Sequence, residues 1–370
     1  MAHGTTINTA ATANRASGFD IERSIVTHRR WLTVMVCLLC ASAVVVIGSL
    51  RFGAESISYT DVVDIFLLWL RNGPARMESA EPNFMILMYV RLPRIILAFM
   101  VGGCLATVGV GLQALLRNPL ADPYVLGISS GAALGAALAM LIGAGTTIMA
   151  MSSLPLFAFI GGLLSIGIVY RIAVSYGHLP VHTLLLAGVV LNAVFSALIM
   201  FITSIMDPNR SFGMMSWLMG TLLAPDYPAL GALAVYVGVG TAVLATQSTA
   251  LNILTLGEES ARSLGVEVER LKKMIFVTAA LLTGAVVSVS GLIGFVGMVI
   301  PHAVRLFVGP DHRLLLPASA LVGGMFLVIA DALARTLLAP SEIPVGVVTA
   351  LAGGPIFLYL LTRRKGGLAS

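Results

Sequence analysis

Charged residues are scarce in this chain of 370 residues: 11% are Asp, Glu, Lys or Arg, whereas 58% are hydrophobic. The mean hydropathy is +0.97. An average water-soluble domain carries about 25% charged residues. A chain with so few charges cannot cover its own surface in water, so we expect a lipid bilayer to surround most of it.

Residues that carry out bond chemistry are also few. The sequence has no glycine-lysine phosphate loop and no HExxH zinc motif. Its three cysteines, Cys37, Cys40 and Cys104, all lie in apolar runs. The first two have CxxC spacing, but the second pair that a structural zinc site needs is missing from the sequence. We therefore expect buried thiols, no metal site, no cofactor and no catalytic residues.

The basic excess of the chain has two possible meanings. The formal net charge of +5 would suit nucleic-acid binding if the charges were clustered. The Lys and Arg residues are instead scattered between apolar runs, which is typical of the signal that orients membrane helices. With the N-terminus in the cytoplasm, 15 of the 22 Lys and Arg residues fall on the cytoplasmic side. We reject the opposite orientation and expect no nucleic-acid partner.

Ten apolar runs are candidates to cross the bilayer. They cover residues 31–50, 90–115, 124–143, 153–172, 183–203, 228–246, 273–290, 296–308, 314–337 and 345–362. The first run follows basic residues, as in a signal peptide, but it is long enough to span and we favour an uncleaved helix. The sequence therefore predicts an all-α polytopic membrane protein with both termini in the cytoplasm. Residues 1–27 are expected to be disordered there, and residues 28–365 to form one transmembrane domain.

A weak internal repeat supports a transport function. Gly102, Gly109 and Pro119 recur 182 residues later as Gly284, Gly291 and Pro301. The two sets fall on helices expected to run in opposite directions, and such inverted repeats are common in transporters. An ion-coupled secondary transporter is one alternative, although it would normally carry acidic or histidine relays within its helices. Here Asp331 is the one plausible acid at membrane depth, and Arg335 lies one turn away as its expected partner.

Two polar regions have more than one interpretation. In residues 250–273, Gly257 precedes two acids and Gly265 follows, which predicts a rigid, exposed cytoplasmic helix of about seven residues. This helix is either a solvated connector or a docking surface. On the outer side, Arg91 and Arg94 have no acid one turn away, so they either reach the interface or form a positive patch for an acidic partner.

Several motifs in this order resemble the FecCD family, the permeases of type II ABC importers for iron chelates, haem and vitamin B12. They are RLPR at 91–94, QALLRNPLADP at 113–123, LGISSG at 126–131, LGEE at 256–259, GFVG at 294–297, PH at 301–302 and EIPVG at 342–346. The resemblance runs from about residue 31 to 362. It implies a homodimer in a bacterial inner membrane, two copies of a separate cytoplasmic ATP-binding subunit, and a periplasmic substrate-binding protein.

The resemblance also implies roles for particular residues. Arg91, Arg94 and Arg335 would dock the binding protein. The coupling element that contacts the ATPase would comprise Leu256, Gly257, Glu258, Glu259, Ala261, Arg262, Leu264 and Gly265. The fifth helix, about Leu184 to Thr203, and the segment Arg210 to Leu218 would line and gate the pathway. Candidate pathway residues are Asn192, Ser196, Met200 and Thr203. The expected cargo is an iron(III)-siderophore, with haem and cobalamin as alternatives.

Overall fold

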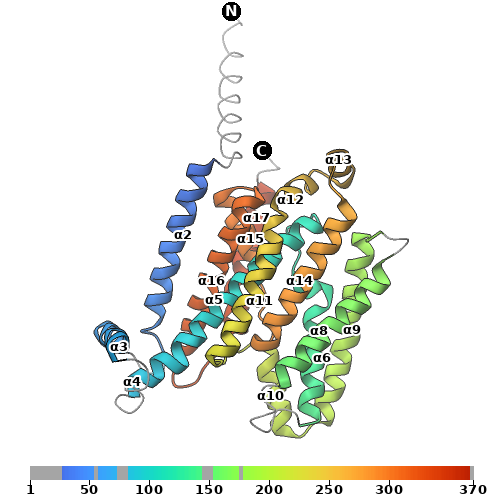
Figure 1. The fold of residues 1–370 in the computed structure, drawn as a ribbon. Coiled ribbons are helices and arrows are strands. Elements are labelled where there is room, and N and C mark those ends of the chain that lie inside the picture. Colours follow the sequence, from blue (N-terminus) through green and yellow to red (C-terminus); the bar gives the residue numbers. More distant parts are fainter. Residues whose placement is uncertain (1–26, 54–56, 73–81, 144–152, 175–177, 367–370) are drawn as a thin grey trace, which may run out of the picture.

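The computed structural model describes residues 27–53, 57–72, 82–143, 153–174 and 178–366. Every regular element in that part of the chain is a helix (Figure 1). The N-terminal segment that the sequence predicts to be disordered lies outside the described residues, apart from Thr27, whose hydroxyl caps the first described helix.

Ten apolar helices account for the ten predicted runs. They are α2 (His28–Ser49), α5 (Leu92–Leu115), α6 (Ile128–Leu141), α8 (Ser153–Ala173), α9 (Val181–Ile205), α11 (Tyr227–Thr246), α14 (Val268–Ser290), α15 (Val296–Val308), α16 (His312–Thr336) and α17 (Val345–Gly366). Seven of the spans that they form are long and apolar enough to cross a membrane, and α6, α15 and α17 are shorter apolar helices. The predicted polytopic all-α fold is confirmed.

Short helices connect the long ones at both ends of the bundle. They are α3 (Tyr59–Asn72), α4 (Pro82–Met85), η2 (Ile86–Arg91), η3 (Pro123–Leu126), α10 (Pro208–Leu218), α12 (Ser248–Leu254) and α13 (Glu258–Ser263). In Figure 1, α12 and α13 lie at the same end as the start of α2 and the end of α17. Helices α3, α4 and α10 lie at the opposite end. We call these the α13 end and the α10 end.

Helix α5 lies at the centre of the bundle. In its most apolar window 83% of the residues are buried, against 17% for α2. Glycine permits this close packing: a Cβ on Gly109 would lie 1.8 Å from the carbonyl oxygen of Gly297 in α15. Small residues of this kind let membrane helices approach backbone to backbone. The glycine-rich pattern of the sequence thus marks the central helix.

The structure corrects one expectation and qualifies another. Cys37 and Cys40 are exposed on α2, because this peripheral helix packs mainly on α16 and leaves its other faces open. The prediction of buried thiols is wrong for these two and right for Cys104. Helices α5 and α14 run in opposite directions (Figure 1), but Gly109 lies inside α5 whereas its counterpart Gly291 ends α14. The inverted repeat stays a prediction.

Candidate functional site

The residues singled out in the sequence fall in three separate regions of the fold. The arginines lie at the α10 end, the proposed coupling element lies at the α13 end, and the candidate pathway residues lie along α9. Among the described residues, no group of three His, Cys, Asp or Glu side chains is placed to hold a metal ion.

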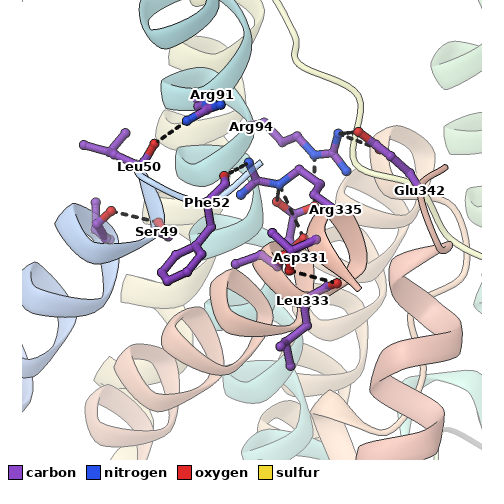
Figure 2. Close-up of polar contacts among 12 residues, drawn as sticks. Ser49, Leu50, Phe52, Arg91, Arg94, Asp331, Leu333, Arg335 and Glu342 are labelled. Atoms are coloured by element: carbon purple, nitrogen blue, oxygen red, sulfur yellow. Dashed lines mark hydrogen bonds and ion pairs between the residues drawn. The ribbon is translucent and has the colours of Figure 1, made fainter. Parts of the chain in front are cut away.

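At the α10 end, a buried carboxylate joins α5 to α16 (Figure 2). Asp331 Oδ1 accepts a hydrogen bond of 2.9 Å from Arg94 Nε, and Asp331 Oδ2 lies 2.9 Å from Arg335 Nε. The predicted contact between Asp331 and Arg335, one turn apart, is confirmed. Arg94 Nη1 also lies 2.9 Å from an oxygen of Glu342, whose side chain is 50% exposed. We call Arg94, Asp331, Arg335 and Glu342 the arginine cluster.

The segment that follows α2 accepts hydrogen bonds from one nitrogen each of Arg91 and Arg335. Arg91 Nη1 donates to the carbonyl oxygen of Leu50 at 2.8 Å, and Arg335 Nη1 donates to that of Phe52 at 2.8 Å. Carbonyl groups just beyond a helix have no partner within the helix, so they are natural acceptors. Arg91 and Arg335 are each only 4% exposed. Neighbouring backbone and Asp331 thus bind these two guanidinium groups within the protein, and the docking role of the arginines stays a prediction.

At the α13 end, the predicted short helix is present as α13. Gly257 precedes it with φ +116° and Gly265 follows it with φ +82°, conformations that favour glycine. Leu256 and Leu264, on either side of the helix, are 67% and 62% exposed. Ala261 is buried, so this member of the predicted coupling element packs α13 onto the protein and is not available to a partner.

A polar network beneath α13 was not predicted from the sequence. Lys272 in α14 is 3% exposed, and its Nζ lies 2.9 Å from Glu269 and 3.2 Å from Glu258. It also donates to the carbonyl oxygen of Leu179 at 3.2 Å. In the sequence, Lys272 counts only toward the cytoplasmic charge excess. The signal that it is paired is the three-residue spacing from Glu269, which places both side chains on one helix face.

The predicted pathway residues on α9 have different surroundings. Asn192 Nδ2 donates to the carbonyl oxygen of Tyr124 at 2.8 Å, and its Oδ1 accepts from the hydroxyl of Ser130. Its amide therefore binds α9 to η3 and α6 within the protomer. Ser196 and Met200 are exposed on α9, and the Thr203 hydroxyl bonds to its own helix. Their role in a pathway stays a prediction.

One sequence pattern that suggests an enzyme finds no support in the structure. Residues 127–131 read GISSG, which matches the G-x-S-x-G spacing of a nucleophilic serine. That motif requires a serine hydroxyl exposed on a sharp turn and activated by a base. Ser129 is instead buried within α6, and its hydroxyl has no hydrogen-bond partner among the described residues.

The comparisons with known proteins agree with the fold. Residues 41–363 match the model of the FecCD transport family. The chain is 43% identical to a cobalamin import system permease of Halobacterium salinarum over 322 residues, which are 87% of this chain and 82% of that protein. It is 40% identical to the hemin transport system permease of Yersinia pestis over 89% of this chain and 95% of that protein.

A solved structure has the same architecture. It is described as an inward-facing conformation of a putative metal-chelate type ABC transporter. The two chains are 29% identical, with a TM-score of 0.75 over 90% of this chain and 99% of that one. Family match, relatives and fold all cover nearly the whole described bundle. The chain therefore belongs to the FecCD transport family and has the fold of a polytopic ABC-transporter permease.

Proposed function

We propose that the chain is the permease subunit of an ATP-driven importer, which moves a metal chelate from the periplasm to the cytoplasm by alternating access. The observation that carries the ATP-driven part is α13. It is a short helix bounded by two glycines with flanking leucines exposed, at the end where α2 begins and α17 ends. A connector in water does not need exposed leucines, whereas a docking surface for a protein partner does.

This arrangement and the family match support a set of partners for the permease. Two copies of a separate cytoplasmic ATP-binding subunit dock on α13 of each protomer and hydrolyse the nucleotide. The protomers form a homodimer in the inner membrane, with the pathway between them. Helix α9 suits a position beside that pathway, because it presents exposed apolar residues such as Val190, Val194 and Phe201. Ser196, Met200 and Thr203 lie on this same helix.

A periplasmic binding protein delivers the chelate to the α10 end. Of the three arginines, Arg94 is the most accessible, with a side chain 12% exposed and an exposed partner in Glu342. An acidic residue of the binding protein reaches Arg94 by taking the place of Glu342. Arg91 and Arg335 contribute by holding the surrounding segments in place. In this proposal the binding protein docks by replacing Glu342 as a partner of Arg94, and no open positive patch is required.

The cargo is a metal chelate, with an iron(III)-siderophore as the first candidate. Haem and cobalamin are alternatives supported by the hemin and cobalamin relatives. An iron-uptake system permease of Bacillus subtilis is 35% identical over 78% of this chain and supports the first candidate. These three cargoes share a metal held in a large organic ligand, so a single wide pathway with few specific contacts suits all of them.

Reconstitution into liposomes with the ATPase subunit and binding protein tests this function. We expect uptake of one of the three chelates only when ATP is present on the ATPase side. Uptake driven by a proton gradient without nucleotide would contradict the proposal. The variant Glu259→Arg, on the exposed side of α13, should reduce association with the ATPase subunit and uptake, with normal membrane insertion. The matched control is Asp61→Arg on α3 at the opposite end, which should retain the ATPase subunit.

A further inference from the structure

The buried ammonium group of Lys272 connects its own helix to the neighbouring α13 and to a segment 93 residues earlier in the chain. Glu258 belongs to α13, Glu269 belongs to α14, and Leu179 lies two residues before α9 begins. All three have oxygen atoms within 3.2 Å of Lys272 Nζ. Glu269 strengthens the link because its Oε2 accepts a hydrogen bond of 2.8 Å from the Leu179 amide.

The charge and burial of Lys272 make this link strong. A buried charge is costly unless it is paired and hydrogen-bonded, so the three oxygens cannot be released singly without penalty. Arg262 lies near the same two carboxylates, but at 3.5 Å from Glu258 and 3.3 Å from Glu269, and its side chain is 51% exposed. Arg262 therefore helps to balance the two negative charges, but Lys272 is the buried cation that also bonds to Leu179.

Helix α9 is held at a second point farther along. The backbone of Gly188 approaches η3 so closely that a Cβ there would lie 2.4 Å from the carbonyl oxygen of Val125. One turn later, the Asn192 side chain bonds to η3 and α6. The contacts of Gly188 and Asn192 therefore act as a fixed point on α9. When Leu179 is displaced, the start of α9 moves while this point stays in place, so the helix tilts.

We propose that Lys272 is a positioning residue that transmits the movement of α13 to the start of α9. This inference rests on the proposed function, in which ATP binding by the partner subunit moves α13. When α13 moves, Glu258 moves with it, and Lys272 carries the displacement to Leu179 through contacts that stay intact. Helix α9, beside the proposed pathway, then changes its tilt. Lys272 does not touch the cargo or the nucleotide.

Three variants test this role in the reconstituted complex: Lys272→Met, Lys272→Arg and the control Lys273→Met. Lys273 is the next residue of α14, but it is exposed and lies over the ring of Tyr170 at 5.8 Å. We expect Lys272→Met to retain the ATPase subunit and its hydrolysis, while chelate uptake per ATP falls roughly tenfold or more, as expected for losing a charge-assisted contact. Lys272→Arg should restore much of the uptake, and Lys273→Met should resemble the wild type.

Some outcomes would overturn the inference. Unchanged uptake per ATP in Lys272→Met would do so, and so would a Lys272→Arg variant as defective as Lys272→Met. The proposed function fails separately, if Glu259→Arg leaves both ATPase association and uptake unchanged.

A distance measurement covers the case in which Lys272→Met does not fold. Spin labels at His178 and Ser263, both exposed, should keep their separation when ATP binds, because the link holds them together. The separation between labels at His178 and Leu120, in the turn after α5, should change. If the first distance changes while the second stays constant, the segments move independently and the inference is wrong.

Discussion

The substitution Asp331→Asn tests whether the arginine cluster holds α5 and α16 together. Asp331 is fully buried and lies 2.9 Å from both Arg94 and Arg335. An asparagine has nearly the same size but no charge, so Arg335, 4% exposed, is left buried beside a neutral amide. Removing one partner of a buried ion pair costs about 3–5 kcal/mol. Because two arginines depend on this carboxylate, we expect a loss in the upper part of that range.

The assay is thermal unfolding of the purified permease in detergent, with Glu342→Gln as the matched control. Glu342 is 50% exposed and pairs with Arg94, and an exposed pair of this kind contributes about 0–1 kcal/mol. We therefore expect a much larger drop in the unfolding midpoint for Asp331→Asn. The double variant Asp331→Asn/Arg335→Met should recover part of the loss, because it removes one unpaired charge. Equal midpoints for the Asp331 and Glu342 variants would refute the reasoning.

Three further predictions concern packing, pH and the α10 end. Gly109→Ala should destabilise the bundle by about 1–3 kcal/mol or more, because its Cβ meets backbone, whereas Gly167→Ala in α8 has nothing within 4 Å and should be neutral or stabilising in the same unfolding assay. Burial by itself raises the pKa of Asp311, but the hydrogen bonds from Arg313 and Asn252 together outweigh this effect and lower the pKa to about 2. Its contribution to stability is therefore complete above the unfolded pKa of about 3.9 and is lost as the pH falls toward about 2. Unfolding midpoints measured from pH 5 down to pH 2 should fall more steeply for the wild type than for Asp311→Asn, and parallel curves would contradict this. Finally, Arg210 donates to the carbonyl oxygens of Met140 at 3.3 Å and Leu141 at 2.9 Å, the last two residues of α6. Arg210→Gln should therefore increase hydrogen exchange in α10, and unchanged exchange would show that this contact does not hold α10.

The positions of the helices were predictable from the sequence because their signals are local. Apolar runs of sufficient length locate α2, α9 and the other spans, and glycines mark the ends of α13. The gap between the predicted apolar runs 273–290 and 296–308 is also confirmed, since α14 ends at Ser290 and α15 begins at Val296. The composition also predicted a membrane protein without any knowledge of tertiary contacts, because a low share of charged residues indicates that lipid surrounds the chain.

The sites were less predictable because they depend on partners far along the chain. The sequence shows no acid one turn from Arg94, and in the structure Arg94 pairs with Asp331, which is 237 residues away. In the sequence, Lys272 is one of several cytoplasmic charges, and only the structure shows that it is enclosed by α13 and the segment before α9.

The sequence by itself determined that most of this protein is embedded in a lipid bilayer, that it has ten apolar helices, and which family motifs it carries. Only the tertiary structure decided which charged groups are buried and which remain available to other proteins. The physical reason is that hydropathy and turn signals act over a few residues, whereas the cost of burying a charge is met by whichever groups the packed helices bring beside it.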